Sequence, residues 1–199
     1  MTIEPRNITN FQRTEYELQE FILFVVAVAG KSSEMQSRKL DIFLAPHNEL
    51  PFDRINRLVA QGNFMEVLMQ SKIGQYRRIG KAWMNLAKSG LDLRTCTLAE
   101  LEQIEGLGPK SSRFFALHSR PNQHIAVLDT HILGWMRSRG WKAPKATPSQ
   151  PLYGKLEVAF LMECIWGGQS PAALDLAIWK DRQVQSAAAK ALKAKVVVA

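Results

Sequence analysis

The clearest candidate for chemistry is a short stretch, Ile-Glu-Gly-Leu-Gly-Pro-Lys, that ends at Lys110. Gly106 and Gly108, on either side of Leu107, let a backbone approach a phosphate closely. Pro109 suits the first position of a following helix, whose free N–H groups and positive dipole end would face that phosphate. Such a hairpin reads no base edge, so it predicts a DNA contact that is independent of base sequence. Taken by itself, Lys110 is best interpreted as one more phosphate contact.

A carboxylate follows 19 positions later (129 − 110), at Asp129 in the run Val-Leu-Asp-Thr-His-Ile. Its position fits an ordinary N-cap of a helix over about 130–139. His131 has two interpretations, a phosphate contact or a hydrogen bond within its own helix. These residues alone do not choose between a catalytic and a structural role for Asp129.

Helical signals are frequent along the chain and strand signals are scarce, which predicts an all-α fold. Thr97 and Glu100 form a capping box, and Gly106 is expected to end the short helix that they begin. Together with the next helix, they predict a helix–hairpin–helix over about 97–119. The first helix carries apolar residues on all sides, so we expect it to be buried nearly all round. The expected helices cover about 14–30, 34–44, 52–61, 64–71, 74–89, 109–119, 130–139, 150–166 and 171–179.

Composition limits the class of protein. The 199 residues fit one domain, or one globule of two lobes, and 46% hydrophobic residues are ample for a core. A formal net charge of +8 and a pI of about 9.7 favour a polyanionic partner, without separating DNA from RNA or an anionic membrane. The two cysteines, Cys96 and Cys164, cannot build a four-cysteine metal site.

Three further features favour a soluble protein of the cytoplasm, associated with the nucleoid in a prokaryote. Free cysteines fit a reducing compartment. The longest apolar run, Phe21 to Ala29, is too short to cross a bilayer, and the acidic residues before it do not suit a signal peptide.

The sequence Gly30-Lys31-Ser32 resembles a P-loop ending, but Val25 stands where that motif needs a glycine, so no nucleotide cofactor is expected.

Taken together, these fragments resemble the helix–hairpin–helix (HhH-GPD) DNA glycosylase superfamily, and most of all its short archaeal-type 8-oxoguanine DNA glycosylase/AP lyases. In that superfamily a lysine stands at the Lys110 position, and an aspartate in a Val-Asp-Thr-His stretch stands at the Asp129 position. The resemblance also covers the region 153–157 and the run Leu-Asp-Leu-Ala-Ile-Trp that ends at Trp179. Its register extends over roughly residues 15–180.

The resemblance implies a single catalytic domain over 1–199, built as two helical lobes, that flips a nucleotide of double-stranded DNA into its cleft. Lys110 would attack C1′, expel the base and hold the sugar as a Schiff base before β-elimination cuts the strand. Asp129 would deprotonate the amine or stabilise positive charge on the sugar. The implied protein is a monomer without a metal or small-molecule cofactor, although the hairpin carbonyls are expected to suit a monovalent cation.

The chain departs from the archaeal pattern at Gly30, which replaces the asparagine that fills the gap left by the flipped nucleotide. Lys31 is the candidate replacement. About 20 residues follow Trp179, a basic Ala- and Lys-rich extension over 181–199, whose Lys190, Lys193 and Lys195 are expected to be solvated. Candidates for the base pocket, each with a core role as its alternative, are Trp166, Asp175 and Trp179.

Three other functions stay open on the sequence. The same chemistry could act on a hypermodified phage base rather than on 8-oxoguanine, as a defence rather than as repair. The hairpin could instead belong to a DNA-binding module without catalysis, or the basic surface could bind an acidic protein.

Overall fold

The structure is a computed structural model that describes the backbone of residues 3–197 and the side chains of residues 3–184. Its described part is all-helical and contains no strand. The chain divides into two compact units, Met1–Asn122 and Gln123–Ala199. The elements of unit 1 are η1 (Pro5–Asn7), α1 (Glu15–Val28), α2 (Ser33–Leu44), α3 (Pro51–Ala60), α4 (Phe64–Gln70), α5 (Tyr76–Lys88), α6 (Leu98–Glu102) and α7 (Pro109–Ser119). Unit 2 holds α8 (Thr130–Ser138), α9 (Leu152–Trp166) and α10 (Pro171–Val197).

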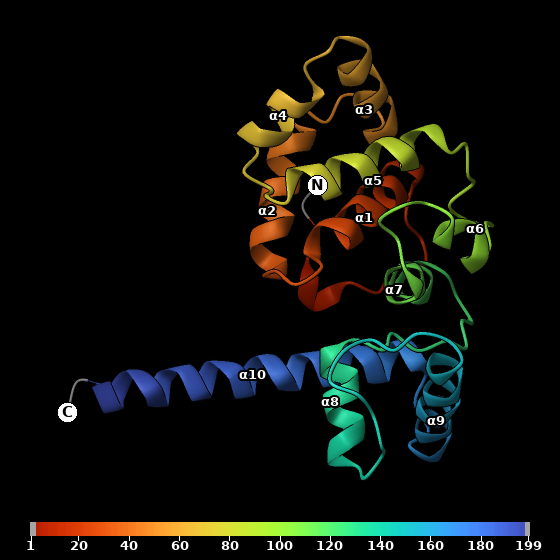
Figure 1. Cartoon of the computed structure of the whole chain (residues 1–199), viewed down its shortest axis with the longest axis vertical. Coiled ribbons are helices and arrows are strands. Elements are labelled where there is room, and N and C mark those ends of the chain that lie inside the picture. Colours follow the sequence, from red (N-terminus) through yellow and green to blue (C-terminus); the bar gives the residue numbers. More distant parts are fainter. Residues whose placement is uncertain (1–2, 198–199) are drawn as a thin grey trace. The chain divides into compact units, whose positions relative to one another are not determined.

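Helix α1 is the centre of unit 1 (Figure 1). It packs against α2, α3, α5 and α7, and every residue from Leu18 to Ala27 is buried. The prediction that this helix is buried nearly all round is therefore confirmed. Its largest neighbours are aromatic: Phe43 lies 4.9 Å from Trp83 between ring centroids, and the Trp83 indole N–H donates to the Leu23 carbonyl at 3.1 Å.

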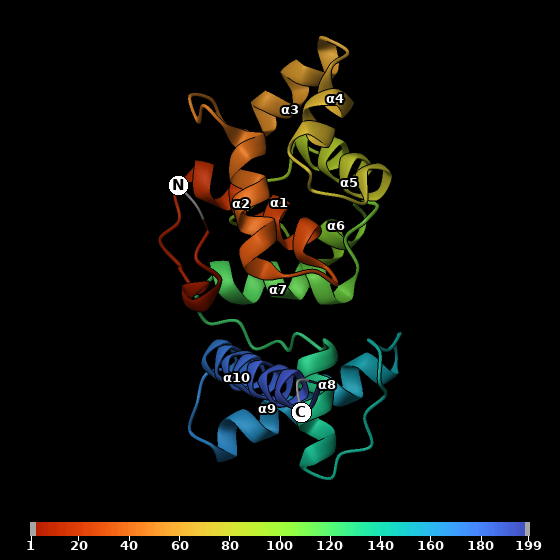
Figure 2. The same ribbon diagram turned by 90° about the vertical axis from the view of Figure 1, so that its left-hand side faces the viewer.

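Helix α7 carries the residues that follow the glycine hairpin, and it packs on both α6 and α1 (Figure 2). Its bounds are those predicted from the sequence, with Pro109 at the first position. The capping box of α6 is also confirmed: the Thr97 N–H donates to Glu100 at 2.7 Å, and the Glu100 N–H donates to the Thr97 hydroxyl at 3.2 Å. Helix α6 ends at Glu102, earlier than expected, and a turn continues to Gly106.

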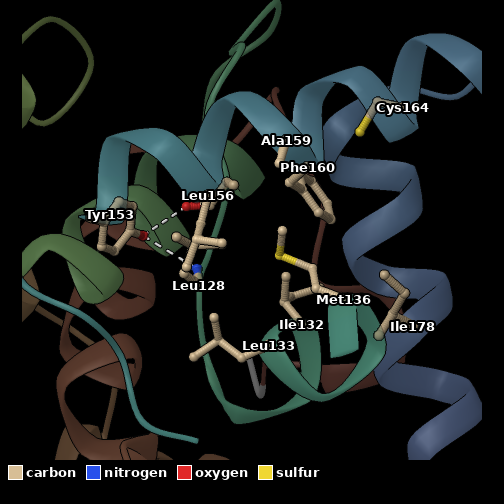
Figure 3. Packing of buried hydrophobic residues seen from close by; sticks show 11 residues of the cluster. Leu128, Ile132, Leu133, Met136, Tyr153, Leu156, Ala159, Phe160, Cys164 and Ile178 are labelled. Atoms are coloured by element: carbon tan, nitrogen blue, oxygen red, sulfur yellow. Dashed lines mark hydrogen bonds between the residues drawn. The ribbon is translucent and has the colours of Figure 1, made fainter. Parts of the chain in front are cut away.

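Unit 2 has its own core, in which α8, α9 and α10 supply apolar side chains around Phe160 and Met136 (Figure 3). Asp129 is the N-cap of α8, as predicted.

The prediction that the last helix ends near Trp179 is wrong. Helix α10 continues to Val197, because the alanines and lysines beyond Trp179 are strong helix formers and no glycine or proline interrupts them. The side chains of Lys190, Lys193 and Lys195 lie outside the described residues.

Candidate active site

The two hairpin glycines serve different purposes. Gly106 has a φ of +103°, and a Cβ there would lie 2.6 Å from the Cβ of Ala82 on α5. Its lack of a side chain is therefore required by the fold itself. Gly108 has a φ of −103° and ψ of −179°, ordinary extended backbone, and a Cβ there would meet nothing within 4 Å. The fold of the described chain gives no reason for a glycine at 108.

Leu107 anchors the hairpin. Its side chain is buried, and its N–H donates to the Ile104 carbonyl at 2.9 Å. Leu107 therefore holds the hairpin to the fold, and the exposed glycines on either side of it are the positions open to an external ligand. Gly108 is the N-cap of α7 and supplies no side-chain cap to it. Pro109 has no N–H, and the N–H groups of Ser111 and Ser112 donate to the Gly108 carbonyl at 3.0 and 3.1 Å. The first turn of α7 therefore offers a ligand the positive end of the helix dipole and the Lys110 N–H, without a capping side chain from Gly108.

Lys110 stands in that first turn, half-buried, with its Nζ 4.9 Å from the centroid of the Phe114 ring. In the part of the chain that the structure describes, it makes no ion pair. The hairpin carboxylates already have other partners: Glu105 lies 2.8 Å from Lys81, and Glu102 lies 2.9 Å from Arg113. The Lys110 amine therefore rests on an aromatic face rather than on a carboxylate.

The ring beneath Lys110 is itself braced. The Phe114 ring meets that of His118 edge-on, at 5.1 Å between centroids, and the His118 Nδ1 is 2.8 Å from the Thr9 hydroxyl. Lys110, Phe114 and His118 are spaced by four, so they form one stripe along α7. Phe114 is not among the residues predicted from the sequence, although its i+4 spacing from Lys110 is a usable signal.

Asp129 is held rigidly by the start of α8. Its Oδ1 accepts from the N–H groups of His131 at 2.8 Å and Ile132 at 2.9 Å. These bonds and the positive end of the helix stabilise a negative charge on the half-buried carboxylate. His131 takes part through its backbone, and its side chain is half-buried in the first turn.

Lys31 lies in the turn between α1 and α2, where its Nζ donates to the Ile73 carbonyl at 2.8 Å. Burial and the like charges of Lys39 and Arg78 lower the pKa of Lys31. This corner of unit 1 thus gathers three cations whose mutual repulsion an anionic ligand would relieve. Ser32 caps α2 through its hydroxyl, a local role that accounts for the residue after Lys31.

The three candidates for the base pocket have different surroundings. Trp166, the last residue of α9, is 65% exposed. Asp175 is buried and Trp179 is half-buried, both on α10 and one turn apart. Asp175 and Trp179 are thus near one another along a helix face, whereas Trp166 ends a different helix.

Within the described residues, no group of three or more His, Cys, Asp or Glu side chains is placed to hold a metal ion. None of the described helices combines the length and the hydropathy that crossing a bilayer requires. Searches against protein-family models and against solved structures found no match to this chain.

Proposed function

We propose that this protein is a bifunctional DNA N-glycosylase and AP lyase that flips a damaged or modified base out of duplex DNA and excises it. Lys110 is the nucleophile and Asp129 is its carboxylate partner. The proposed fold is the two-lobed HhH-GPD arrangement, and 8-oxoguanine is the first base to test.

The observation that carries the proposal is the setting of Lys110. Lys110 stands in the first turn of α7 and follows the hairpin in the chain. The fold leaves room for a side chain at Gly108. The neighbouring carboxylates, Glu105 and Glu102, pair with other cations. A phosphate approaching Gly108 would meet the open backbone and the helix dipole. This arrangement would bring a DNA strand next to an amine whose neighbouring carboxylates, Glu102 and Glu105, pair with other cations.

The proposed reaction has two stages. The neutral Lys110 amine forms a bond to C1′ of the flipped nucleotide as the N-glycosidic bond breaks, and the base leaves with the bonding electrons and gains a proton. Asp129 offsets positive charge on the sugar and accepts a proton from the amine. The nitrogen lone pair then opens the sugar ring: the C1′–O4′ bond breaks, O4′ takes the proton held by Asp129, and C1′ is left in a Schiff base with Lys110. The Schiff base makes the C2′ proton acidic, and loss of that proton breaks the C3′–O bond and expels the 3′ phosphate by β-elimination. Water then releases Lys110.

The function is tested by identifying the released base. The protein is incubated with duplex oligonucleotides that carry different oxidised bases, and with phage DNAs that carry hypermodified bases, and free bases are identified by mass spectrometry. We expect one class of base to be released by the wild type and not by Lys110→Gln. Binding of duplex DNA without release of any base would instead support a non-catalytic module.

A further inference from the structure

The backbone that leads into Asp129 lies in an irregular segment, residues 123–129, between α7 and α8. Ala126, Val127 and Leu128 are nevertheless buried, so their backbone polar groups need partners within the protein. In an extended chain, the carbonyl of one residue and the N–H of the residue two positions later point to the same side. In a β-sheet, the neighbouring strand forms hydrogen bonds with both groups. The described chain has no strand to do so.

A tyrosine hydroxyl bonds both groups. The Tyr153 hydroxyl donates to the Ala126 carbonyl at 2.8 Å and accepts from the Leu128 N–H at 3.2 Å. Figure 3 shows both bonds as dashed lines from the ring, which stands on α9 at one end of the hydrophobic cluster. Tyr153 is fully buried, so water cannot easily replace its hydroxyl in either bond.

Two other side chains tie down the same segment. Glu157, one turn further along α9, accepts from the Ala126 N–H at 2.9 Å. The Thr147 hydroxyl donates to the Leu128 carbonyl at 2.9 Å. The Asp129 N–H then closes a tight turn onto the Val127 carbonyl at 2.7 Å, which directs the chain into α8.

We infer that Tyr153 is a positioning residue for the reaction, and that its hydroxyl fixes the backbone from which the Asp129 carboxylate projects. The inference rests on the proposed function. The helix cap fixes Asp129 relative to α8, while Tyr153 fixes the incoming chain relative to α9. Loss of the hydroxyl leaves a buried carbonyl and a buried N–H without this partner, and the segment shifts to satisfy them. Such a shift misplaces the carboxylate, whereas the hairpin proposed to bind DNA belongs to the other unit and is held by its own contacts there.

The test is Tyr153→Phe, which keeps the ring and removes the hydroxyl. Probes are a duplex with 8-oxoguanine opposite cytosine and a duplex with a single abasic site. We expect the single-turnover rate at saturating protein to fall by about 10-fold to 100-fold, because a misplacement of about 1 Å can cost about 100-fold in rate. The protein concentration at half-saturation should be nearly unchanged. Hydrogen exchange at the Leu128 amide should accelerate in the same variant.

Tyr16→Phe is the matched control, because it also removes a hydroxyl, one that lies 2.7 Å from the His47 Nδ1 in unit 1. Its rate should equal that of the wild type. Thr147→Val is the second variant. Thr147 is exposed, so the substitution removes one hydrogen bond to the Leu128 carbonyl without opening the core. Its rate should fall by less than that of Tyr153→Phe.

The outcomes separate the inference from the function on which it rests. A wild-type rate in folded Tyr153→Phe, or equal losses in Tyr153→Phe and Tyr16→Phe, overturns the positioning role and leaves the proposed function standing. A Tyr153→Phe that does not fold passes the test to Thr147→Val. A wild-type rate in that variant together with faster hydrogen exchange at the Leu128 amide would also overturn the positioning role, because the segment would have loosened without any cost to the rate. A folded wild type that neither cuts the abasic duplex nor releases a base overturns the proposed function, and the inference with it.

Discussion

Lys110 and Asp129 are held in opposite ways. Asp129 receives two backbone N–H bonds at the start of α8. The chain that leads into it is held by Tyr153 of α9 and by Thr147 of the loop between α8 and α9. The Lys110 amine contacts the face of the Phe114 ring. In the proposed reaction the carboxylate keeps its place and the amine moves to a sugar carbon, and these two arrangements suit those roles.

Asp129→Asn separates catalysis from structure, because asparagine caps a helix about as well as aspartate. We expect the variant to fold and to bind duplex DNA nearly as tightly as the wild type. Its excision rate at saturation should fall by about 100-fold or more, the usual contribution of a general acid–base group. Loss of binding with an unchanged rate at saturation would mean that Asp129 holds DNA and takes no part in the chemistry.

Among the elements, α6, the hairpin and α7 form the helix–hairpin–helix. Its two glycines have different roles, so substitutions at each should have different effects. Gly108→Ser adds a hydroxyl that can cap α7 and compete with a phosphate for its N–H groups. We expect thermal stability to be unchanged or slightly higher, and affinity for duplex DNA to fall by a similar factor for all base sequences. Thermal melts and fluorescence anisotropy measure the two quantities.

Gly106→Ala is the complementary variant. Its Cβ would lie 2.6 Å from that of Ala82 and its φ is +103°, so we expect a loss of about 1–3 kcal/mol in the free energy of unfolding. A destabilised Gly108→Ser, or one that binds DNA as the wild type does, would contradict the role given to the hairpin.

Local chemistry made several elements predictable from the sequence. The Thr97–Glu100 capping box, Pro109 at the start of α7 and the Asp129 cap each depend on residues within four positions of one another. Those patterns placed both candidate catalytic residues on the correct elements. The end of α10 was mispredicted, because the tail was interpreted by its charge and not by its helix propensity.

Contacts between distant residues could not be obtained in this way. The Tyr153 hydroxyl meets backbone groups 25 and 27 positions earlier, and nothing in the local sequence marks it as different from a core tyrosine. The same holds for Gly106, whose need to be a glycine comes from Ala82 on α5. Sequence spacing also gives no distance between Lys110 and Asp129, which belong to different units.

For the molecule as a whole, the net charge of +8 predicts that binding to duplex DNA depends on salt. With three or more phosphates neutralised, the logarithm of the binding constant should fall with the logarithm of salt concentration at a slope of about −2.7 or steeper. Anisotropy titrations between about 50 and about 200 mM salt measure it. A slope near zero would argue against a nucleic-acid partner and in favour of an acidic protein.

Stability should depend on pH through Glu20, a buried residue of α1. Burial, with the negative charges of Asp41 and Glu17 adding to it, raises the pKa of Glu20 from 4.5 to about 7. The folded state thus holds the proton more tightly than the unfolded state. This stabilisation is complete below pH 4.5, declines as the pH rises, and is lost above about 7.

Glu20→Gln should remove that dependence, since glutamine mimics the protonated acid. Between about pH 5 and 8, the wild-type free energy of unfolding in urea should fall by on the order of 2 kcal/mol through this group. The fall should be much smaller in the variant, and identical pH profiles for the two proteins would show that Glu20 is solvated.

Borohydride trapping measures most directly whether Lys110 forms a Schiff base with the sugar. Wild-type protein is mixed with an abasic duplex, reduced, digested and analysed by mass spectrometry. We predict a stable protein–DNA adduct whose cross-linked peptide carries the sugar on Lys110, and no adduct with Lys110→Gln, although that variant still binds the duplex. An adduct of equal yield in Lys110→Gln, or none with the wild type despite tight binding, would contradict the assignment of Lys110 as the nucleophile.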